Sequence, residues 1–226
     1  MARRSCLLIH RILLRLGQSS FLLTSLFVIN ISAPLAAPLP ADPVAFMSQV
    51  LANAAKIINN KADPVERRSQ FAQLFHDDFD APGIARFVSG RYWRTASQED
   101  QQEFLSLFDD YVVFVYTARL GDFGGGTFAI LGSRSDGDGA IVSTAVSSPG
   151  STSPLKIDWR LVAHNGAYKI SDVIVEGISM SITQRSEFAS VVQRNGGQLH
   201  SLIALMREKT ASAAATRANT TAGSRE

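Results

Sequence analysis

The chain has almost no cysteine. Its 226 residues include one, Cys6, close to the N-terminus. If that segment is removed on export, the protein keeps no thiol, and disulfides, cysteine-ligated metals and cysteine nucleophiles are all excluded. Its stability must then come from buried apolar side chains, which a composition of 46% hydrophobic residues can supply.

A strong excess of charge is also missing. The 22 lysines and arginines against 20 aspartates and glutamates give a formal net charge of +2. Arg3, Arg4, Arg11 and Arg15 belong to the N-terminal segment, and without these four the balance is 18 basic to 20 acidic residues, a net of −2. Because nucleic-acid binding needs a basic surface that neutralises phosphates, we expect no nucleic-acid partner.

Recognisable catalytic and metal-binding spacings are absent from the sequence as well. His76, His164 and His200 lie on separate predicted elements, with no HxxxH or HExxH spacing to bring two of them together. There is no GxSxG elbow, and the glycines at 124–126 lack the GK[ST] ending of a phosphate loop. The acidic residues near 77–80 are typical of a solvated loop. We therefore predict no catalytic residue, no metal and no cofactor, and a binding protein rather than an enzyme.

The N-terminal segment has the pattern of a secretory signal peptide. Arginines precede an apolar stretch that ends in several alanines. We predict a signal peptide over residues 1–37, with cleavage between residues 33 and 41. An uncleaved anchor is the alternative, because residues 16–37 are nearly long enough to span a bilayer.

Helical patterns dominate the next part of the chain. Asp42-Pro43 and Asp63-Pro64 each place a capping carboxylate before a proline at the first helical position, which predicts helices over about 43–58 and 64–76. After a short helical piece at 84–88, a longer helix opens at Ser97. Its apolar residues recur three and four positions apart and include Phe104, Leu107, Phe108, Tyr111, Val112, Val115 and Tyr116.

From residue 127 the apolar period changes to two. This predicts strands over about 128–132, 140–146, 155–162 and 168–175, and the glycine-containing turns between them favour an antiparallel meander with one buried face. Two closing helices follow, and residues 210–226 are expected to be disordered. The fold class is α+β: one domain over 43–209, with an antiparallel four-stranded sheet covered on one face by a helical layer.

The long helix and the strands carry a large supply of apolar side chains. The helix contributes Phe104, Phe108, Tyr111, Val112 and Val115, and the strands contribute Ile157, Trp159, Ile170 and Val173. Such residues ordinarily make a packed core. A cavity for acyl chains would use the same residue types, and periodicity does not distinguish a filled interior from a hollow one.

Short segments spread along the chain resemble signatures of the MlaC/toluene-tolerance family. They follow the family's order across about residues 43–207, and they are residues 79–80, 84–86, 90–94, 111–120, 158–160, 169–173, 175–180, 183–188 and 195–197. The resemblance implies a periplasmic carrier that holds diacyl phospholipid tails in a cavity between the sheet and the helices. It further implies exchange of lipid with an outer-membrane lipoprotein complex and with an inner-membrane ABC transporter that bears a membrane-anchored ring protein.

Given that resemblance, the nine apolar residues named above for the helix and strands become the expected cavity lining. Arg91 and Arg94 become candidates for contact with a lipid headgroup or the transporter, and ordinary solvated side chains are the alternative. We expect a monomer.

Three other functions stay open at this point. The cargo could be another lipid, such as a hopanoid. An isomerase or hydrolase could use the same fold, which would require an acid or base with a shifted pKa inside the cavity. An envelope adaptor with a filled core would need no ligand at all.

Overall fold

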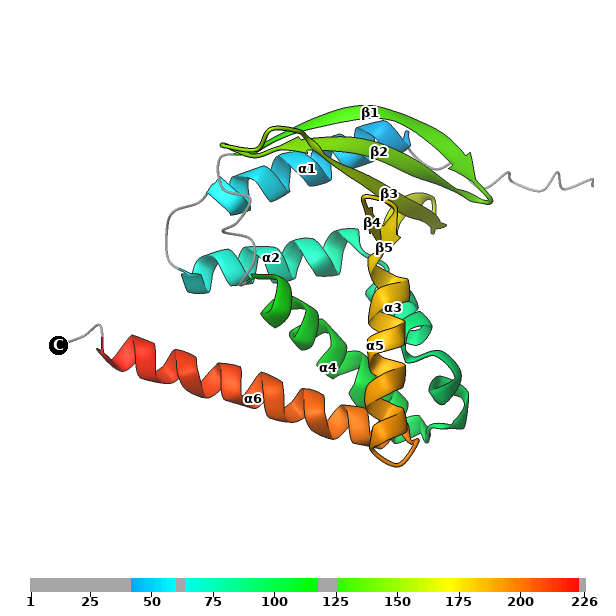
Figure 1. Cartoon of the computed structure of the whole chain (residues 1–226), viewed down its shortest axis with the longest axis vertical. Coiled ribbons are helices and arrows are strands. Elements are labelled where there is room, and N and C mark those ends of the chain that lie inside the picture. Colours follow the sequence, from blue (N-terminus) through cyan, green and yellow to red (C-terminus); the bar gives the residue numbers. More distant parts are fainter. Residues whose placement is uncertain (1–41, 60–63, 118–125, 224–226) are drawn as a thin grey trace, which may run out of the picture. The chain divides into compact units, whose positions relative to one another are not determined.

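The computed structural model describes residues 42–59, 64–117 and 126–223, with side chains up to residue 211. The predicted signal peptide and the Asp63 cap lie outside these residues. The helices are α1 (Pro43–Asn59), α2 (Pro64–Asp78), α3 (Ala81–Ser89), a 3-10 turn (Gly90–Thr95), α4 (Gln98–Thr117), α5 (Met180–Arg194) and α6 (Leu199–Gly223). The strands are β1 (Thr127–Asp136), β2 (Gly139–Ser147), β3 (Leu155–His164), β4 (Ala167–Val175) and β5 (Ile178–Ser179) (Figure 1).

Two helix starts use the side-chain caps that the sequence predicts. The Asp42 carboxylate accepts a hydrogen bond from the Val44 amide at 3.0 Å at the start of α1. The Ser97 hydroxyl accepts one from the Asp100 amide at 3.0 Å at the start of α4. Each cap satisfies a backbone N–H that has no partner within its helix, so both starts are fixed locally.

The strands form one antiparallel sheet in the order β1-β2-β3-β4-β5. The predicted meander is confirmed, but the sheet has five strands rather than four. The fifth is two residues long, pairs with the end of β4, and follows a tight turn in which Glu176 and Gly177 have φ of 49° and 81°. A two-residue strand is too short to show alternation in the sequence, which is why the pattern missed it.

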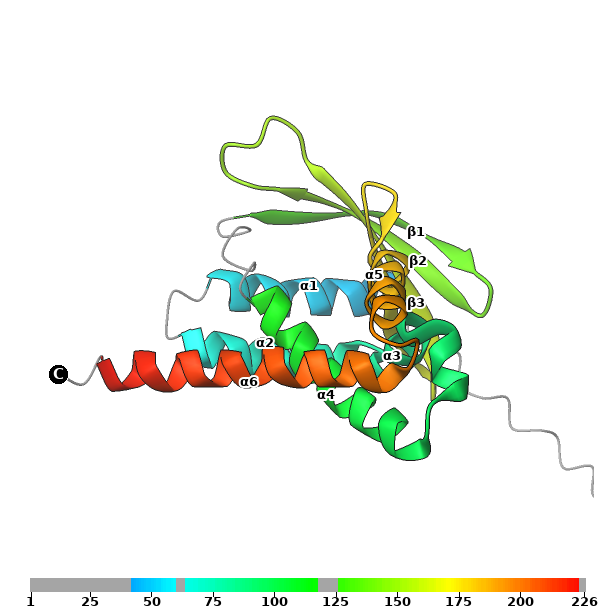
Figure 2. The same ribbon diagram turned by 60° about the horizontal axis from the view of Figure 1, so that its bottom comes forward.

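Apolar side chains gather in two separate clusters. The first, which we call the helical cluster, joins α3, α4, α5 and α6 through residues such as Phe104, Phe188 and Met206. The second, the sheet cluster, joins α1 to the inner face of the sheet through residues such as Met47, Val142 and Ile170. Figures 1 and 2 agree on this arrangement, with α1 against the sheet and α6 alongside α4.

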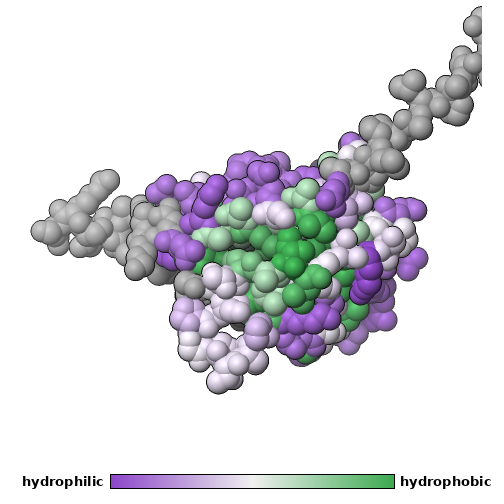
Figure 3. Space-filling view, turned by 90° about the horizontal axis from the view of Figure 1, so that it is seen from above, coloured by the Kyte–Doolittle hydropathy of each residue, from purple (hydrophilic) through white to green (hydrophobic). Residues whose placement is uncertain are grey.

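The outer face of the sheet is not purely polar. Leu131 on β1 is 61% exposed. Ile141, which is only 3% exposed, alternates with Val142 along β2 and pairs with Arg134 and Arg160 on the neighbouring strands. Figure 3 views the molecule from above the orientation of Figure 1, where β1 and β2 lie. Hydrophobic residues gather in this view with hydrophilic ones around them. The alternation within the strands predicted a more uniformly wet face than this.

Helix α6 continues to Gly223, through most of the segment that the sequence analysis expected to be disordered. Alanine has the highest helix propensity of the residues, so an alanine-rich segment can extend a helix without any apolar periodicity. Because this segment has no apolar periodicity, the sequence pattern did not predict the extension. No helix in the described part of the chain has both the length and the hydropathy needed to cross a bilayer.

Candidate functional site

A cavity of about 370 Å³ lies where the helices face the sheet. Such a volume falls at the lower end of the range of about 300–1,000 Å³ that is common for small-molecule sites. The helical side of its wall comes from α1 to α5 and the residue after α2, and consists of Val50, Leu51, Ala54, Ile58, Phe71, Leu74, Phe75, Phe79, Ile84, Val88, Phe108, Val112, Tyr116, Met180, Ser181 and Gln184. The sheet side consists of Phe128, Val146, Ile157, Trp159, Asp172, Val173 and Val175.

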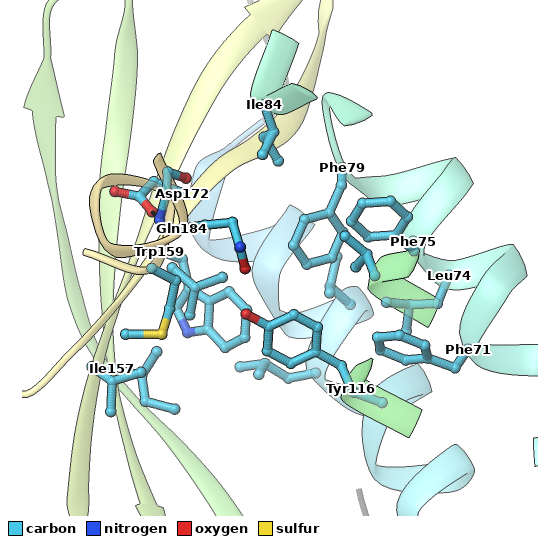
Figure 4. Close-up of a pocket in the computed structure, with 18 of the residues that line it drawn as sticks. Phe71, Leu74, Phe75, Phe79, Ile84, Tyr116, Ile157, Trp159, Asp172 and Gln184 are labelled. Carbon is cyan, nitrogen blue, oxygen red and sulfur yellow. Dashed lines mark hydrogen bonds between the residues drawn. The ribbon is translucent and has the colours of Figure 1, made fainter. Parts of the chain in front are cut away.

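The wall is strongly apolar and rich in aromatic rings. Figure 4 shows Phe71, Phe75 and Phe79 on one side, with Ile157 and Trp159 of β3 on the other. The rings of Phe75 and Phe79 lie 5.0 Å apart, centroid to centroid. A hollow interior of this kind argues against the filled core that a ligand-free adaptor would have.

Two polar groups in the sheet side of the wall are satisfied by the protein itself. The indole N–H of Trp159 donates to the hydroxyl of the buried Thr144 at 2.9 Å. The carboxylate of Asp172, which is 5% exposed, accepts from the Ser179 hydroxyl at 2.6 Å and from the Ser181 amide at 3.0 Å. Because their hydrogen bonds are made within the protein, neither group needs a hydrogen-bond partner from a ligand.

Residues 46–208 match the family model described as MlaC protein. The chain belongs to the MlaC family. This match covers most of the chain and confirms the family resemblance found in the sequence.

Two individual proteins show how far the similarity to this MlaC-family chain extends. A toluene tolerance protein, ttg2D of Pseudomonas putida, is 28% identical over 126 residues, which are 55% of this chain and 58% of that protein. The chain therefore matches a little over half of that relative's length. A phospholipid-binding protein from Ralstonia solanacearum, solved in complex with a phospholipid, is 23% identical, with a TM-score of 0.65 over 77% of this chain and 99% of the other. At that identity, the likeness shows the shared fold.

The cavity of the MlaC-family chain contains five of the nine residues that the sequence analysis expected to line it. These five are Phe108, Val112, Ile157, Trp159 and Val173. Their contact with lipid stays a prediction, because the structure shows their position in the wall and no ligand.

The other four expected residues lie elsewhere. Phe104 is fully buried in the helical cluster, where its ring lies 6.2 Å from that of Phe188, and Tyr111 lies 5.7 Å from the same ring. Ile170 is fully buried in the sheet cluster. Val115 is half-buried on α4, beside the row of residues spaced by four that reaches the cavity. The apolar stripe of α4 therefore packs in the helical cluster at some positions and lines the cavity at others.

Sequence reasoning also missed much of the wall. Helices were predicted over the segments of α1 and α2, but Val50, Ala54 and Phe71 were not assigned to the cavity. Periodicity identifies a buried face without saying what it faces. Gln184 gave no signal in the sequence, because a glutamine on a helix is ordinarily exposed.

Neither predicted headgroup contact lines the cavity. Arg91 is exposed, donates to the Tyr92 hydroxyl at 2.9 Å, and has its guanidinium carbon 4.9 Å from the centre of that ring. Arg94 is exposed on the same 3-10 turn. A role for either arginine in meeting a headgroup or a partner stays a prediction.

A second, more polar crevice of about 490 Å³ lies between α2 and α4. Its wall includes Arg68, His76 and Asp109, and it shares Phe75 with the apolar cavity. Burial raises the pKa of the Asp109 carboxyl above its ordinary value, despite the opposing effect of His76. Within the described ranges, no group of three or more histidine, aspartate, glutamate or cysteine side chains is arranged to hold a metal ion.

Proposed function

We propose that this chain is a periplasmic phospholipid carrier that holds acyl tails in the cavity between the sheet and the helices. It acts as a monomer and is exported by the N-terminal signal peptide. It exchanges lipid with an outer-membrane lipoprotein complex and with an inner-membrane ABC transporter bearing a membrane-anchored ring protein, and so maintains the lipid asymmetry of the outer membrane.

The observation that carries the proposal is the apolar cavity itself. Its wall is made of aliphatic and aromatic side chains, and the polar groups of Trp159 and Asp172 are engaged by neighbours in the fold. Each methylene group moved from water into such a wall contributes about 0.8 kcal/mol. A lipid tail is the ligand that gains most from this wall, and the phospholipid in the solved Ralstonia relative supports that choice.

Transport follows from the same energetics. A lipid shielded from water can cross an aqueous compartment, and its release needs a partner or a membrane that competes for the tails. Membership of the MlaC family and the similarity to a toluene tolerance protein support this role.

An enzymatic use of the cavity is less well supported. Catalysis by general acid or base needs a titratable group with reach to the substrate. The carboxylate in the wall, Asp172, has both oxygens occupied, by Ser179 and by the Ser181 amide. Its geometry fits a structural tie between β4 and the start of α5.

The test is native mass spectrometry with lipid extraction, on protein purified from the periplasm without detergent. We expect phospholipid bound in stoichiometric amount, and an intact mass that corresponds to cleavage between residues 33 and 41. Transfer is then measured by mixing the loaded protein with lipid-free vesicles and following labelled phospholipid into them.

Two results would contradict the proposal. One is a ligand-free protein that also fails to extract phospholipid from vesicles. The other is stoichiometric binding of a different class of molecule, such as a hopanoid, which would keep the carrier and replace its cargo.

A further inference from the structure

Two polar residues in the helical side of the cavity wall, Ser181 and Gln184, lie where β4 meets α5. Ser181 and Gln184 lie in the first turns of α5, next to Asp172 of β4. Ser181 is buried, and its amide donates to Asp172 while its hydroxyl lies 3.4 Å from the Ser171 carbonyl oxygen. The polar groups of Asp172 and Ser181 are therefore used by the fold.

Gln184 differs from these neighbours. Its side chain is half-buried and extends into the cavity from α5 (Figure 4). Its Nε2 group donates to the exposed Glu187 carboxylate at 3.4 Å, which is a long and weak hydrogen bond. A carboxamide has two N–H donors and a carbonyl acceptor, so Gln184 keeps hydrogen-bonding capacity for a ligand.

The charges around Gln184 decide which part of a phospholipid it can meet. No lysine or arginine is among the described residues of the wall, and the carboxylate of Asp172 lies in the same corner. A phosphate placed there would meet a negative charge without a cation to balance it. An ester carbonyl is uncharged, accepts hydrogen bonds and is attached directly to the tail.

We infer that Nε2 of Gln184 donates a hydrogen bond to an ester carbonyl of the bound lipid. This inference rests on the proposed function, and it orients the cargo. The glycerol esters lie at the junction of β4 and α5, the tails run toward the aromatic residues Phe71, Phe75 and Phe79, and the phosphate stays outside this corner.

The experiment compares two phosphatidylcholines with identical headgroups and chain lengths, one with ester-linked and one with ether-linked chains. Each is titrated into the delipidated full-length mature protein, and bound lipid is quantified by native mass spectrometry. We expect the wild type to prefer the diester by about fivefold or more, the ratio that one neutral hydrogen bond supplies. The ratio is measured within one protein, so changes in overall apolar affinity cancel.

Three variants locate the source of the preference. Gln184→Leu removes the donor, and Gln184→Glu keeps the shape but offers an acceptor in its place, so both are expected to bring the ratio to about one. Tyr116→Phe removes the phenol hydroxyl from the same cavity and is the matched control, which should keep the wild-type ratio.

The outcomes separate this inference from the proposed function. Equal binding of the two lipids by the wild type overturns the role of Gln184 and leaves the carrier standing. A preference that is lost in Tyr116→Phe and kept in both Gln184 variants also overturns it. Failure of the wild type to bind either lipid refutes the proposed function itself.

Discussion

The two ends of α4 have the same kind of side chains but different surroundings. At its N-terminal end, Phe104 is fully buried in the helical cluster. Toward its C-terminal end, Val112 and Tyr116 face a cavity. Phe108 lies between them and belongs to both, because it is part of the cluster and also lines the cavity.

The difference comes from what lies opposite each end. Helix α6 runs beside the first half of α4, where Arg207 pairs with Glu103, and the His200 ring lies 3.0 Å from the Asp100 carboxylate. The second half faces the sheet, whose inner side chains already pack on α1. A void is left between the two clusters, and Phe108 of the helical cluster and Leu51 of the sheet cluster line it. Whether an apolar residue is core or cavity lining therefore depends on its neighbours and not on its type.

The largest expected effect on stability comes from truncating one phenylalanine in each of the two regions. Phe104→Ala should lower the free energy of unfolding by about 3–5 kcal/mol, because it opens a new cavity in a filled cluster. Phe71→Ala should cost less than about 2 kcal/mol, because Phe71 is half-buried and already borders empty space. Denaturant unfolding of delipidated protein measures both, and equal losses would show that the two regions are packed alike.

A cavity-filling change sharpens the comparison from the other side. Ala54 lies on α1 in the cavity wall, and Ala54→Leu fills space in which a lipid tail would otherwise bury about three methylene groups. Losing their burial should weaken phospholipid binding by about 2 kcal/mol, which is roughly a 30-fold loss in affinity. Vesicle extraction and titration measure this loss.

The control for that change is Ala52→Leu, which adds the same side chain on an exposed position of the same helix. It should leave the affinity unchanged. If Ala54→Leu also binds lipid as well as the wild type, the tails do not occupy this part of the cavity.

The sequence predicted most of the fold because local rules decide it. The caps at Asp42 and Ser97 and the glycine-containing turns each act within a few residues, and all three signals survive in the structure. Strand β5 was missed because two residues are too few to show the alternation of a strand. The extension of α6 was missed because this part of the helix has no apolar periodicity.

The cavity could be predicted only in part, because its wall is assembled from elements far apart in the chain. Val112 and Ile157 were expected in the lining because of their apolar faces, and both lie in the wall, while Phe104 and Ile170 share the same periodic patterns and are packed inside the clusters. Periodicity does not distinguish residues that line the cavity from residues packed inside the clusters. Gln184 needed the three-dimensional arrangement most, since its place in the wall depends on how α5 leaves the sheet.

The smallest expected effect concerns the polar crevice, which borders the apolar cavity through Phe75. Burial raises the pKa of the Asp109 carboxyl, so the folded protein binds that proton more tightly than the unfolded chain does. Its contribution to stability is present at pH values below the ordinary pKa of 3.8 and is lost as the pH rises through the raised value.

Because the group is half-exposed, we expect Asp109→Asn to stabilise the protein at neutral pH by less than about 0.5 kcal/mol. Thermal unfolding at pH 4 and pH 7 measures this, with the exposed Asp110→Asn as a control for the loss of one negative charge. A variant that is less stable than the wild type at pH 7 would show that the ionised Asp109 is bound by a favourable partner in the crevice, and that the crevice, unlike the apolar cavity, stabilises charge.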